Sequence, residues 1–461
     1  MPRGETSEAA IVTERAPVGT GLENCRCAVV GAGPAGLCAA KYLLQMGARE
    51  VTIYEVGSKV GGLWCYDNDN GMSSAYRTLH INTATNITSF SDLPFDNGVQ
   101  MFPDHVDMHR YLHKFAEKFD LLSRIRFNSR VVDICPNAKY SNESPLWEVK
   151  TVNGDVEIFN RVVVATGHLH NPSHVEQFRR DFSGEYLHSH FYKEPAPYVN
   201  KRICIVGIGN SAVDIASDVC VNSSKTTVVA RSGVMIQPKM IFGVPFTDIT
   251  YKLVQPWIPQ RVRLGLLAFL VRLIHGRMEQ FGFRPVTKRV HITSSAVFVH
   301  HVAYDRIIIK HEIERIEGKR IFFSDGSSDE FDVLIGATGY AIDLPFFSPE
   351  LIKIRDNALE LYNRIVPPEL SGLYFLGFVQ PTTALNLCFE HQMRWIIGVE
   401  VGAVTLPSTE EMKQAIVRKQ EWVRKTFKDT PRHQIEEDHA YYFPGLRVPG
   451  AKKLFGYDLR T

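Results

Sequence analysis

Two glycine-rich turns of the same design lie far apart in this chain, and they restrict its fold more than any other feature. The first occupies residues 31–36 (GAGPAG) and the second residues 207–212 (GIGNSA), each after a short apolar run and before a helix-like segment. A strand, a tight glycine turn and a helix N-terminus in this order form the cradle that holds the pyrophosphate of a dinucleotide. The sequence therefore predicts an α/β fold with two Rossmann-like dinucleotide-binding domains.

An ionisable residue follows each turn at the same distance and indicates which nucleotide that turn binds. Glu55 stands 24 residues after Gly31, and Arg231 stands 24 residues after Gly207; each comes at the end of the next apolar run. A carboxylate there accepts hydrogen bonds from a free ribose 2′-hydroxyl, whereas an arginine there neutralises a 2′-phosphate. The first turn therefore suits FAD or NAD, and the second suits NADP.

A second repeated pattern indicates how the domains are arranged along the chain. The apolar runs 161–165 and 333–337 both end in Thr-Gly, at Thr166 and Thr338. We expect each domain to close with a buried strand that brings this turn beside its nucleotide. A later strand-to-glycine signal at 373–377 predicts that the end of the chain rejoins the first domain. The expected ranges are 1–25 for a disordered lead, 26–170 and 325–461 for a discontinuous FAD domain, and 171–324 for an inserted NADP domain with a helical insertion at about 240–300.

Composition restricts the class of protein further. The net charge of +2 gives no electrostatic bias toward nucleic acid. Eight cysteines are scattered without a CxxC pair, which is typical of free thiols in a reducing compartment, so a cytoplasmic location is predicted. The longest membrane-like run, 264–271, is far shorter than the ~18–20 apolar residues of a membrane span. The N-terminus lacks the apolar core of a signal peptide and the C-terminus lacks an apolar tail, so a soluble or peripheral protein is expected.

The stretch 261–277 is predicted to form an amphipathic helix with two readings. Arginine and histidine gather on one side, and five apolar residues, Leu266, Leu267, Leu270, Leu273 and Ile274, lie opposite. Arg263 breaks the pattern, and its long stem would have to reach out to water. The helix either packs its apolar side on the core or on a partner, or it contacts a membrane surface. The sequence leaves the peripheral membrane contact and a homodimer open.

Three further motifs resemble one family, the flavin-containing monooxygenases, over about residues 26–400. The first is FxGxxxHxxxY, from Phe182 to Tyr192, just ahead of the second turn. The second is the sequence 336–340 (GATGY), and the third is 76–83 (YRTLHINT), followed by 90–95 (FSDLPF). The segment 62–64 (GLW) matches as well. The first motif is the most specific, because it is shared mainly with the related Baeyer–Villiger enzymes.

The resemblance implies an FAD site, an NADP site and one residue that acts on the chemistry. Asn82 matches the asparagine beside the flavin, which helps to stabilise the oxygenated intermediate. His188 matches a residue with a structural or coupling role rather than a proton donor. The expected FAD contacts are Gly31, Ala32, Gly33, Pro34, Ala35, Gly36, Glu55, Gly62, Leu63, Trp64, Asn82, Thr83, Val131 and Thr166. The expected NADP contacts are Gly207, Gly209, Asn210, Ser211, Ala212, Asp214, Arg231, Ser232 and Thr338.

The electron acceptor decides what such a protein does with the hydride that NADPH gives to FAD. Cys65 stands alone after Trp64, so no cysteine pair that could relay electrons to a disulfide is visible. The prediction is therefore an NADPH- and O2-dependent monooxygenase that forms a C4a-hydroperoxyflavin and oxygenates nucleophilic nitrogen or sulfur of small lipophilic compounds. The alternatives are a Baeyer–Villiger ketone monooxygenase, an NADPH oxidase or reductase, and a redox sensor with weak oxygenation. Tyr192 speaks against the Baeyer–Villiger enzymes, which usually carry tryptophan there.

Histidines recur every four positions at His105, His109 and His113, which is the spacing of metal ligands on a helix. The surrounding stretch 104–119 also reads as an ordinary amphipathic helix. The flavin chemistry predicted here needs no metal, so the histidines are interpreted as part of a polar helix face.

Overall fold

The computed structural model describes residues 21–253, 257–427, 430–457 and 459. Residues 1–20 of the predicted disordered lead lie outside the described part. Residues 21–25 of that lead are ordered, which corrects the prediction. Leu22 is fully buried in the first core, and its carbonyl accepts a 2.8 Å hydrogen bond from the Cys25 amide. Removing an apolar side chain from water stabilises this segment by about 1.5–3 kcal/mol, and that gain keeps it on the domain.

Five parallel strands form the first sheet, in the order β22-β7-β1-β2-β3. These strands are β1 (Arg26–Val30), β2 (Glu50–Tyr54), β3 (Ile125–Arg126), β7 (Arg161–Val164) and β22 (Leu373–Phe375). The two strands at the centre, β1 and β7, are almost wholly buried because other elements cover both faces of the sheet. The strand order reverses between β1 and β7, and ligands of open α/β sheets bind at such a point.

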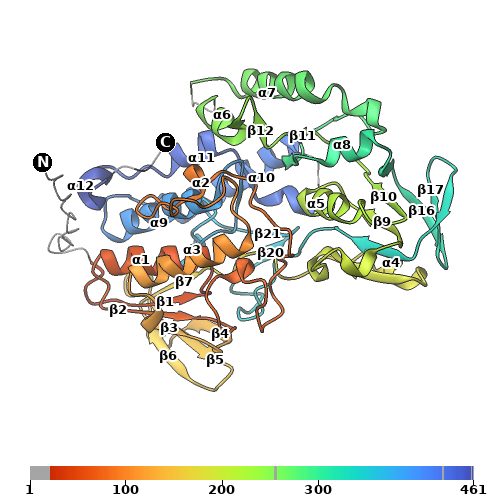
Figure 1. Cartoon of the computed structure of the whole chain (residues 1–461). Coiled ribbons are helices and arrows are strands. Elements are labelled where there is room, and N and C mark those ends of the chain that lie inside the picture. Colours follow the sequence, from red (N-terminus) through yellow and green to blue (C-terminus); the bar gives the residue numbers. More distant parts are fainter. Residues whose placement is uncertain (1–20, 254–256, 428–429, 458, 460–461) are drawn as a thin grey trace, which may run out of the picture.

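The second sheet repeats the design with the order β15-β10-β9-β19-β8, again all parallel. Its strands are β8 (Glu185–His188), β9 (Arg202–Val206), β10 (Lys225–Val229), β15 (Ile307–Lys310) and β19 (Val333–Gly336). The fold is thus α/β with two Rossmann-like sheets, as predicted. The sheets lie in different halves of the molecule, the first with the red and orange strands and the second with the green ones (Figure 1).

Each sheet carries an inserted three-stranded antiparallel sheet, which precedes β7, the fourth strand of the first sheet in chain order, and β19, the fifth strand of the second. In the second of these, the predicted Asp325-Gly326 turn joins two antiparallel strands, and Gly326 has the left-handed φ of +78° that such a turn needs. The strands are β4 (Val131–Pro136), β5 (Trp147–Thr151), β6 (Val156–Phe159), β16 (Ile313–Glu317), β17 (Arg320–Phe323) and β18 (Ser328–Glu330).

Strand pairing shows where the chain passes between the sheets. β22 pairs with β7, so the late part of the chain returns to the first sheet after the whole second sheet has formed. The expected change of domain at residue 325 disagrees with the position of β19, which pairs with β9 and β8 in the second sheet. A buried strand belongs to the sheet that satisfies its backbone hydrogen bonds. We therefore propose that the boundary lies after Gly336, and the division into domains stays a prediction otherwise.

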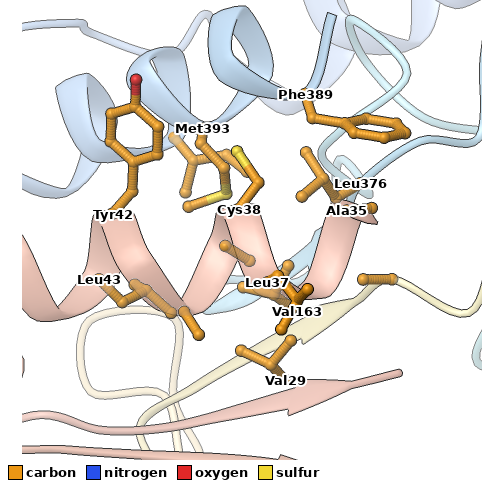
Figure 2. Close-up of a cluster of buried hydrophobic side chains, with 14 of the residues drawn as sticks. Val29, Ala35, Leu37, Cys38, Tyr42, Leu43, Val163, Leu376, Phe389 and Met393 are labelled. Carbon is orange, nitrogen blue, oxygen red and sulfur yellow. The ribbon is translucent and has the colours of Figure 1, made fainter. Parts of the chain in front are cut away.

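Twelve helices lie among the described residues, and two of them form the larger core. α1 lies between the first sheet and α9: Leu37 points toward Val163 and Val29, while Phe389 and Met393 approach from the other side (Figure 2). The helices are α1 (Pro34–Gln45), α2 (Thr85–Thr88), α3 (His105–Lys118), α4 (Glu176–Asp181), α5 (Asn210–Val219), α6 (Phe246–Leu253), α7 (Gln260–His275), α8 (Phe298–Ala303), α9 (Leu385–Glu400), α10 (Thr409–Thr426), α11 (His439–Gly445) and α12 (Ala451–Phe455).

The helix predicted at 261–277 exists as α7, but its orientation differs from the prediction. Arg263, expected to reach water, is 3% exposed and pairs with the equally buried Asp438 at 2.7 Å. Arg263 therefore lies on the buried side of the helix, together with Leu267. Leu266 and Leu273, which the sequence placed on the apolar side, are 41% and 70% exposed. α7 runs along the outer edge of the molecule, beside α6 (Figure 1).

In the described part of the chain, four two-stranded sheets connect segments outside the larger sheets. The amide of Thr382 donates to the carbonyl of Glu437, which ties the segment ahead of α9 to the C-terminal segment. The pairs combine β11 (Ile236–Gln237) with β14 (Thr293–Ser294), β12 (Met240–Ile241) with β13 (Val244–Pro245), β20 (Ile354–Arg355) with β21 (Ala358–Leu359), and β23 (Gln380–Pro381) with β24 (Glu436–Glu437). No helix among the described residues is long and apolar enough to cross a membrane.

Candidate functional site: two dinucleotide turns

The first glycine turn lies between β1 and α1 and fits tightly against β7. Gly31 has φ of +107°, and a Cβ there would stand 2.7 Å from the Ala165 carbonyl oxygen. A Cβ at Gly36 would stand 1.8 Å from the Gly31 oxygen. These two positions admit only glycine because any side chain would push α1 away from the strands. The turn is therefore built for a close approach of backbone to backbone.

The N-terminus of α1 completes this cradle. Gly33 is the N-cap in extended conformation, no side chain caps the helix, and Pro34 opens the first turn. First-turn amides that lack a side-chain cap can donate to an anion, and the helix dipole favours negative charge there. Ala35 is buried at the start of the helix. The arrangement fits the pyrophosphate predicted for this turn.

Glu55, predicted to bind the ribose, lies directly beside the turn. It is 5% exposed, its Oε2 accepts from the Ala32 amide and its Oε1 from the Gly57 amide, both at 2.8 Å. Burial raises the pKa of this carboxyl, and the two amides oppose the rise. Oε1 also accepts from Asn70 Nδ2 at 3.4 Å, but Oε2 has a further lone pair, so Glu55 can hold the turn and still accept a ribose hydroxyl.

The second turn, between β9 and α5, repeats the geometry of the first. Gly207 has φ of +133°, and a Cβ there would stand 2.4 Å from the Ala337 oxygen. Gly209 is an N-cap without a side-chain cap, as Gly33 is. Ala212 replaces the third glycine and is fully buried, so this turn has room for a methyl group. The two Thr-Gly endings thus lie beside their turns, as predicted.

The start of α5 is held by the segment after α7. Asn210 Oδ1 accepts from the Ser294 amide at 2.9 Å, so its side chain faces that segment. Ser211 is half-buried at the helix start. Asp214, assigned to the nucleotide by the resemblance, places its Oδ2 2.7 Å from the Tyr76 hydroxyl. Burial raises the pKa of this carboxyl, and the bond from Tyr76 opposes the rise.

Arg231 follows β10 and is exposed, with Ser232 half-buried after it. The structure adds a second arginine that the sequence did not reveal. Arg284 Nη1 donates to the Arg231 carbonyl at 3.3 Å. The two segments can come this close because Gly233 has no side chain, and a Cβ there would collide with the backbone of residues 284–285. The two cations come from segments 53 residues apart. No local pattern marks Arg284, because only this fold brings it there.

The remaining predicted FAD contacts lie around the first turn or near it. The 3-10 turn at 62–64 packs Gly62 directly against Gly33. A Cβ added to Gly33 would lie 3.6 Å from the Cα of Gly62. Leu63 and Trp64 are half-buried. Thr166 directly follows the Ala165 carbonyl that touches the turn. Val131 is buried at the start of β4, in the same cluster as Tyr54. Thr338, predicted to contact NADP at the second turn, donates to the Ser173 carbonyl.

Asn82 carries an unused buried acceptor. Its Oδ1 is buried and receives no hydrogen bond from any described residue. The next hydroxyl, Thr83 Oγ1, is occupied by Thr88 Oγ1 at 2.7 Å. A buried polar atom without a partner costs about 1–3 kcal/mol, which makes this carboxamide a candidate contact for a bound cofactor. α9 begins beside it, where Asn386 donates to the Thr88 carbonyl at 2.9 Å.

Comparison with known proteins agrees with this geometry. The model of the family described as "FMO-like: flavin-binding monooxygenase-like" matches residues 24–452. The chain belongs to this family. Flavin-containing monooxygenase 5 of Cavia porcellus is 31% identical over 433 residues, which cover 90% of this chain and 80% of that protein. Dimethylaniline monooxygenase (N-oxide-forming) 2 of Oryctolagus cuniculus is 29% identical, with 93% and 83% covered.

Solved structures share the fold of this monooxygenase. S-allyl-L-cysteine S-oxygenase from Allium sativum superposes with a TM-score of 0.70 and 23% identity over 95% of this chain and 90% of that one. Cyclohexanone monooxygenase in its closed form gives 0.67 and 14% identity, with 95% and 99% covered. At such identities the likeness shows the fold alone. The family relationship shows that the protein is an NADPH-dependent flavin monooxygenase with FAD as its cofactor.

The residues of this monooxygenase fit both cofactors. The glycine cradles leave no room for side chains, Glu55 can still accept a hydroxyl, and Arg231 stays exposed. These residues would hold FAD and NADPH, and the bound pair would supply hydride transfer and the reduction of dioxygen. The chain's own part would be to hold the two nucleotides at these turns, and Asn82 Oδ1 is a buried acceptor that receives no hydrogen bond from the described residues.

His188 of the FxGxxxHxxxY motif is fully buried in β8, and burial lowers its pKa to about 4. Its Nδ1 accepts from the His190 amide at 3.1 Å. A neutral ring that accepts from the His190 amide can hold this turn of the chain, and the structural or coupling role implied by the resemblance stays a prediction.

The three histidines of α3 point to different partners. His109 Nε2 bonds the Val60 carbonyl at 2.9 Å, His113 pairs with Glu117 at 3.3 Å, and the His105 ring packs on Tyr66. No group of three metal-ligating side chains was found among the described residues.

Proposed function

We propose that this monooxygenase transfers one oxygen atom to a nucleophilic nitrogen or sulfur of small lipophilic compounds in the cytoplasm. Two relatives support this substrate class by their names, one an N-oxide-forming monooxygenase and one an S-oxygenase. Asn82 carries the proposal, because a buried carboxamide with a free acceptor is suited to hydrogen-bond a reactive oxygenated state in a dry site.

The placement of the cysteines supports oxygen over a disulfide as the acceptor. Cys65 is buried after the 62–64 turn, and all eight cysteines are free thiols. Burial raises the pKa of the Cys65 thiol, so it is a poor source of thiolate for a redox relay. A reductase that passes electrons through a cysteine pair is therefore disfavoured.

A substrate panel tests the proposal. A thioether, a tertiary amine and a cyclic ketone are each incubated with enzyme, NADPH and isotopically labelled dioxygen, and the products are analysed by mass spectrometry. We expect label in a sulfoxide or an N-oxide. Label in a lactone instead would indicate Baeyer–Villiger chemistry, and peroxide as the only product would indicate an oxidase.

In the Asn82→Ala variant, NADPH is expected to reduce the bound flavin at the normal rate, but the enzyme should release more hydrogen peroxide. Removing one hydrogen-bonding group of this kind typically costs a factor of ~10²–10³ in the step that it assists. Stopped-flow reduction and peroxide assays under turnover measure the two effects separately. Asn137→Ala, which removes a carboxamide bonded to Glu148 between β4 and β5, is the matched control. An unchanged peroxide yield in Asn82→Ala would assign the residue to structure alone.

We further infer that the outer side of α7 contacts a membrane surface. Four apolar residues at spacings of four, three and four form a stripe on it: Val262, Leu266, Phe269 and Leu273, each 41–70% exposed. The helix contains no acidic residue, and Arg261 and Arg272 are exposed beside the stripe. An apolar stripe flanked by cations matches the interface of an anionic bilayer. Phe242, 97% exposed, extends the apolar surface on the neighbouring hairpin.

Vesicle binding tests this contact. The protein is expected to sediment with vesicles that contain phosphatidylserine. The double variant Leu266→Glu/Phe269→Glu should bind these vesicles at least ~10-fold more weakly, because each apolar side chain buried in the membrane contributes about 1.5–3 kcal/mol. Val221→Glu, at an equally exposed site elsewhere, should sediment as the parent does. Failure of the parent to sediment would refute the contact, and so would a loss of dimer in the double variant, because the stripe would then bind a second copy.

A further inference from the structure

The segment that leads to Asn82 is attached to the second nucleotide-binding half of the molecule, although it follows the first turn in sequence. The Lys193 ammonium donates to the carbonyls of Ser73 and Ala75, both at 2.9 Å. The Arg77 amide donates to the Lys193 carbonyl at 2.7 Å. Lys193 directly follows the FxGxxxHxxxY motif, so the end of this motif is hydrogen-bonded to the backbone of residues 73–77.

Two carboxylates of α5 hold the same segment from another side. Tyr76 donates to Asp214 Oδ2 at 2.7 Å, and Thr78 donates to Asp218 Oδ2 at 2.9 Å. Tyr192 donates to the same oxygen of Asp218. The two aspartates are four residues apart, so they lie one helical turn apart on one side of α5. Both therefore face the segment at once.

The chain crosses between the two cores within a few residues of these bonds. Tyr76 is 5% exposed within the second core, and Leu79 packs against that core. The Ile81 amide, in contrast, donates to the Pro103 carbonyl at 2.9 Å, just before α3 of the first core. Asn82 follows at once. Its position is therefore determined by two attachments, one on each side of the crossing.

We propose that Asp214 and Asp218 are positioning residues, which couple occupation of the second nucleotide turn to the placement of Asn82. α5 begins at Asn210 in that turn, and the aspartates follow one and two helical turns later. A helix moves as a rigid body, so a nucleotide that fixes its N-terminus also fixes the two carboxylates and the segment they hold. This inference rests on the proposed role of Asn82.

Such coupling is reciprocal in its binding free energies. If bound NADP⁺ holds the segment, then releasing the segment from α5 must weaken NADP⁺ binding by the same factor. One hydrogen bond contributes about 0.5–1.5 kcal/mol, which corresponds to roughly 2- to 12-fold. FAD binding at the first turn should not change, because neither aspartate touches it.

Hydrogen–deuterium exchange with the FAD-bound enzyme tests the proposal without relying on turnover. We expect NADP⁺ to slow exchange in peptides that cover residues 74–83. In Thr78→Val and in Asp218→Leu this protection should fall about 2- to 12-fold, and the Kd of NADP⁺ should rise by the same factor. Asp218→Asn, which keeps an oxygen acceptor for both hydroxyls, should restore both values. Thr78 is exposed, so its variant keeps the test valid if Asp218→Leu does not fold.

The matched control is Arg77→Met. Arg77 lies in the same segment, but its guanidinium pairs with Glu194 at the surface, 3.2 Å away. The proposal would be overturned if exchange protection and the Kd of NADP⁺ stayed at the parent values in Thr78→Val and Asp218→Leu. It would also be overturned if Arg77→Met lost as much protection and affinity as these two variants. Neither readout depends on which substrate is oxygenated, so the outcome is separate from that of the labelled-dioxygen panel.

Discussion

Replacing Gly36 by alanine is expected to strip the enzyme of its flavin. The new Cβ would stand 1.8 Å from the Gly31 carbonyl oxygen, a separation that no two unbonded atoms adopt. The contact is with backbone on one side and the start of α1 on the other, so α1 must move away from β1. Overpacking of this kind costs about 1–3 kcal/mol or more.

Gly36 belongs to the turn that is predicted to hold the FAD pyrophosphate, so this strain destabilises the FAD-binding conformation of the turn. Converted at 1.4 kcal/mol per tenfold, that cost weakens FAD binding roughly 5- to 150-fold. The ratio of flavin to protein absorbance after gel filtration measures the loss, and circular dichroism checks that the fold persists. Gly265→Ala is the control, since this glycine also lies within a helix but has nothing within 4 Å of an added Cβ. Full flavin content in Gly36→Ala would show that the close contact is not required.

Replacing Arg231 by alanine is expected to remove most of the preference for NADPH over NADH. The side chain is exposed at the end of β10, where the ribose of a nucleotide in the second turn would lie. A hydrogen bond to a charged group contributes about 1.5–3 kcal/mol. kcat/KM for NADPH should therefore fall roughly 10- to 150-fold, while the value for NADH changes little.

Two further variants sharpen this experiment. Arg284→Ala should reduce the same preference by a smaller factor, because its guanidinium lies at the Arg231 backbone. Arg272→Ala, an exposed arginine on α7, should leave the preference unchanged. Steady-state kinetics with both nucleotides measure all three. A constant NADPH to NADH ratio in Arg231→Ala would refute the assignment of the second turn.

Local sequence predicted the two turns because their chemistry lies within a few residues. Gly31 and Gly207 both take a positive φ against the carbonyl of an Ala-Thr-Gly ending, and both the glycine and the ending could be recognised in the sequence. Glu55 could be found for the same reason, since the residue at the end of the second strand always returns to the turn beside the first. The family followed from motifs of the same local kind.

Other features depended on contacts between distant segments. The sequence placed Arg263 on the apolar side of α7 but expected its charged end to reach water, because helical periodicity cannot foresee a buried partner at Asp438, 175 residues later. It ended the second domain ahead of β19, since strand pairing between residues 185–188, 203–206 and 333–336 has no local signal.

The sequence by itself determined that this protein has two dinucleotide cradles with opposite charge preferences, because a tight turn and its ribose-binding residue are encoded within about 25 residues. Only the tertiary structure decided that the segment ahead of Asn82 is held by α5 of the second sheet. Tyr76 and Thr78 reach carboxylates 138 and 140 residues away. Such pairs form when two separately folded sheets pack together, and the geometry of that packing is set by the whole core rather than by any stretch of the chain.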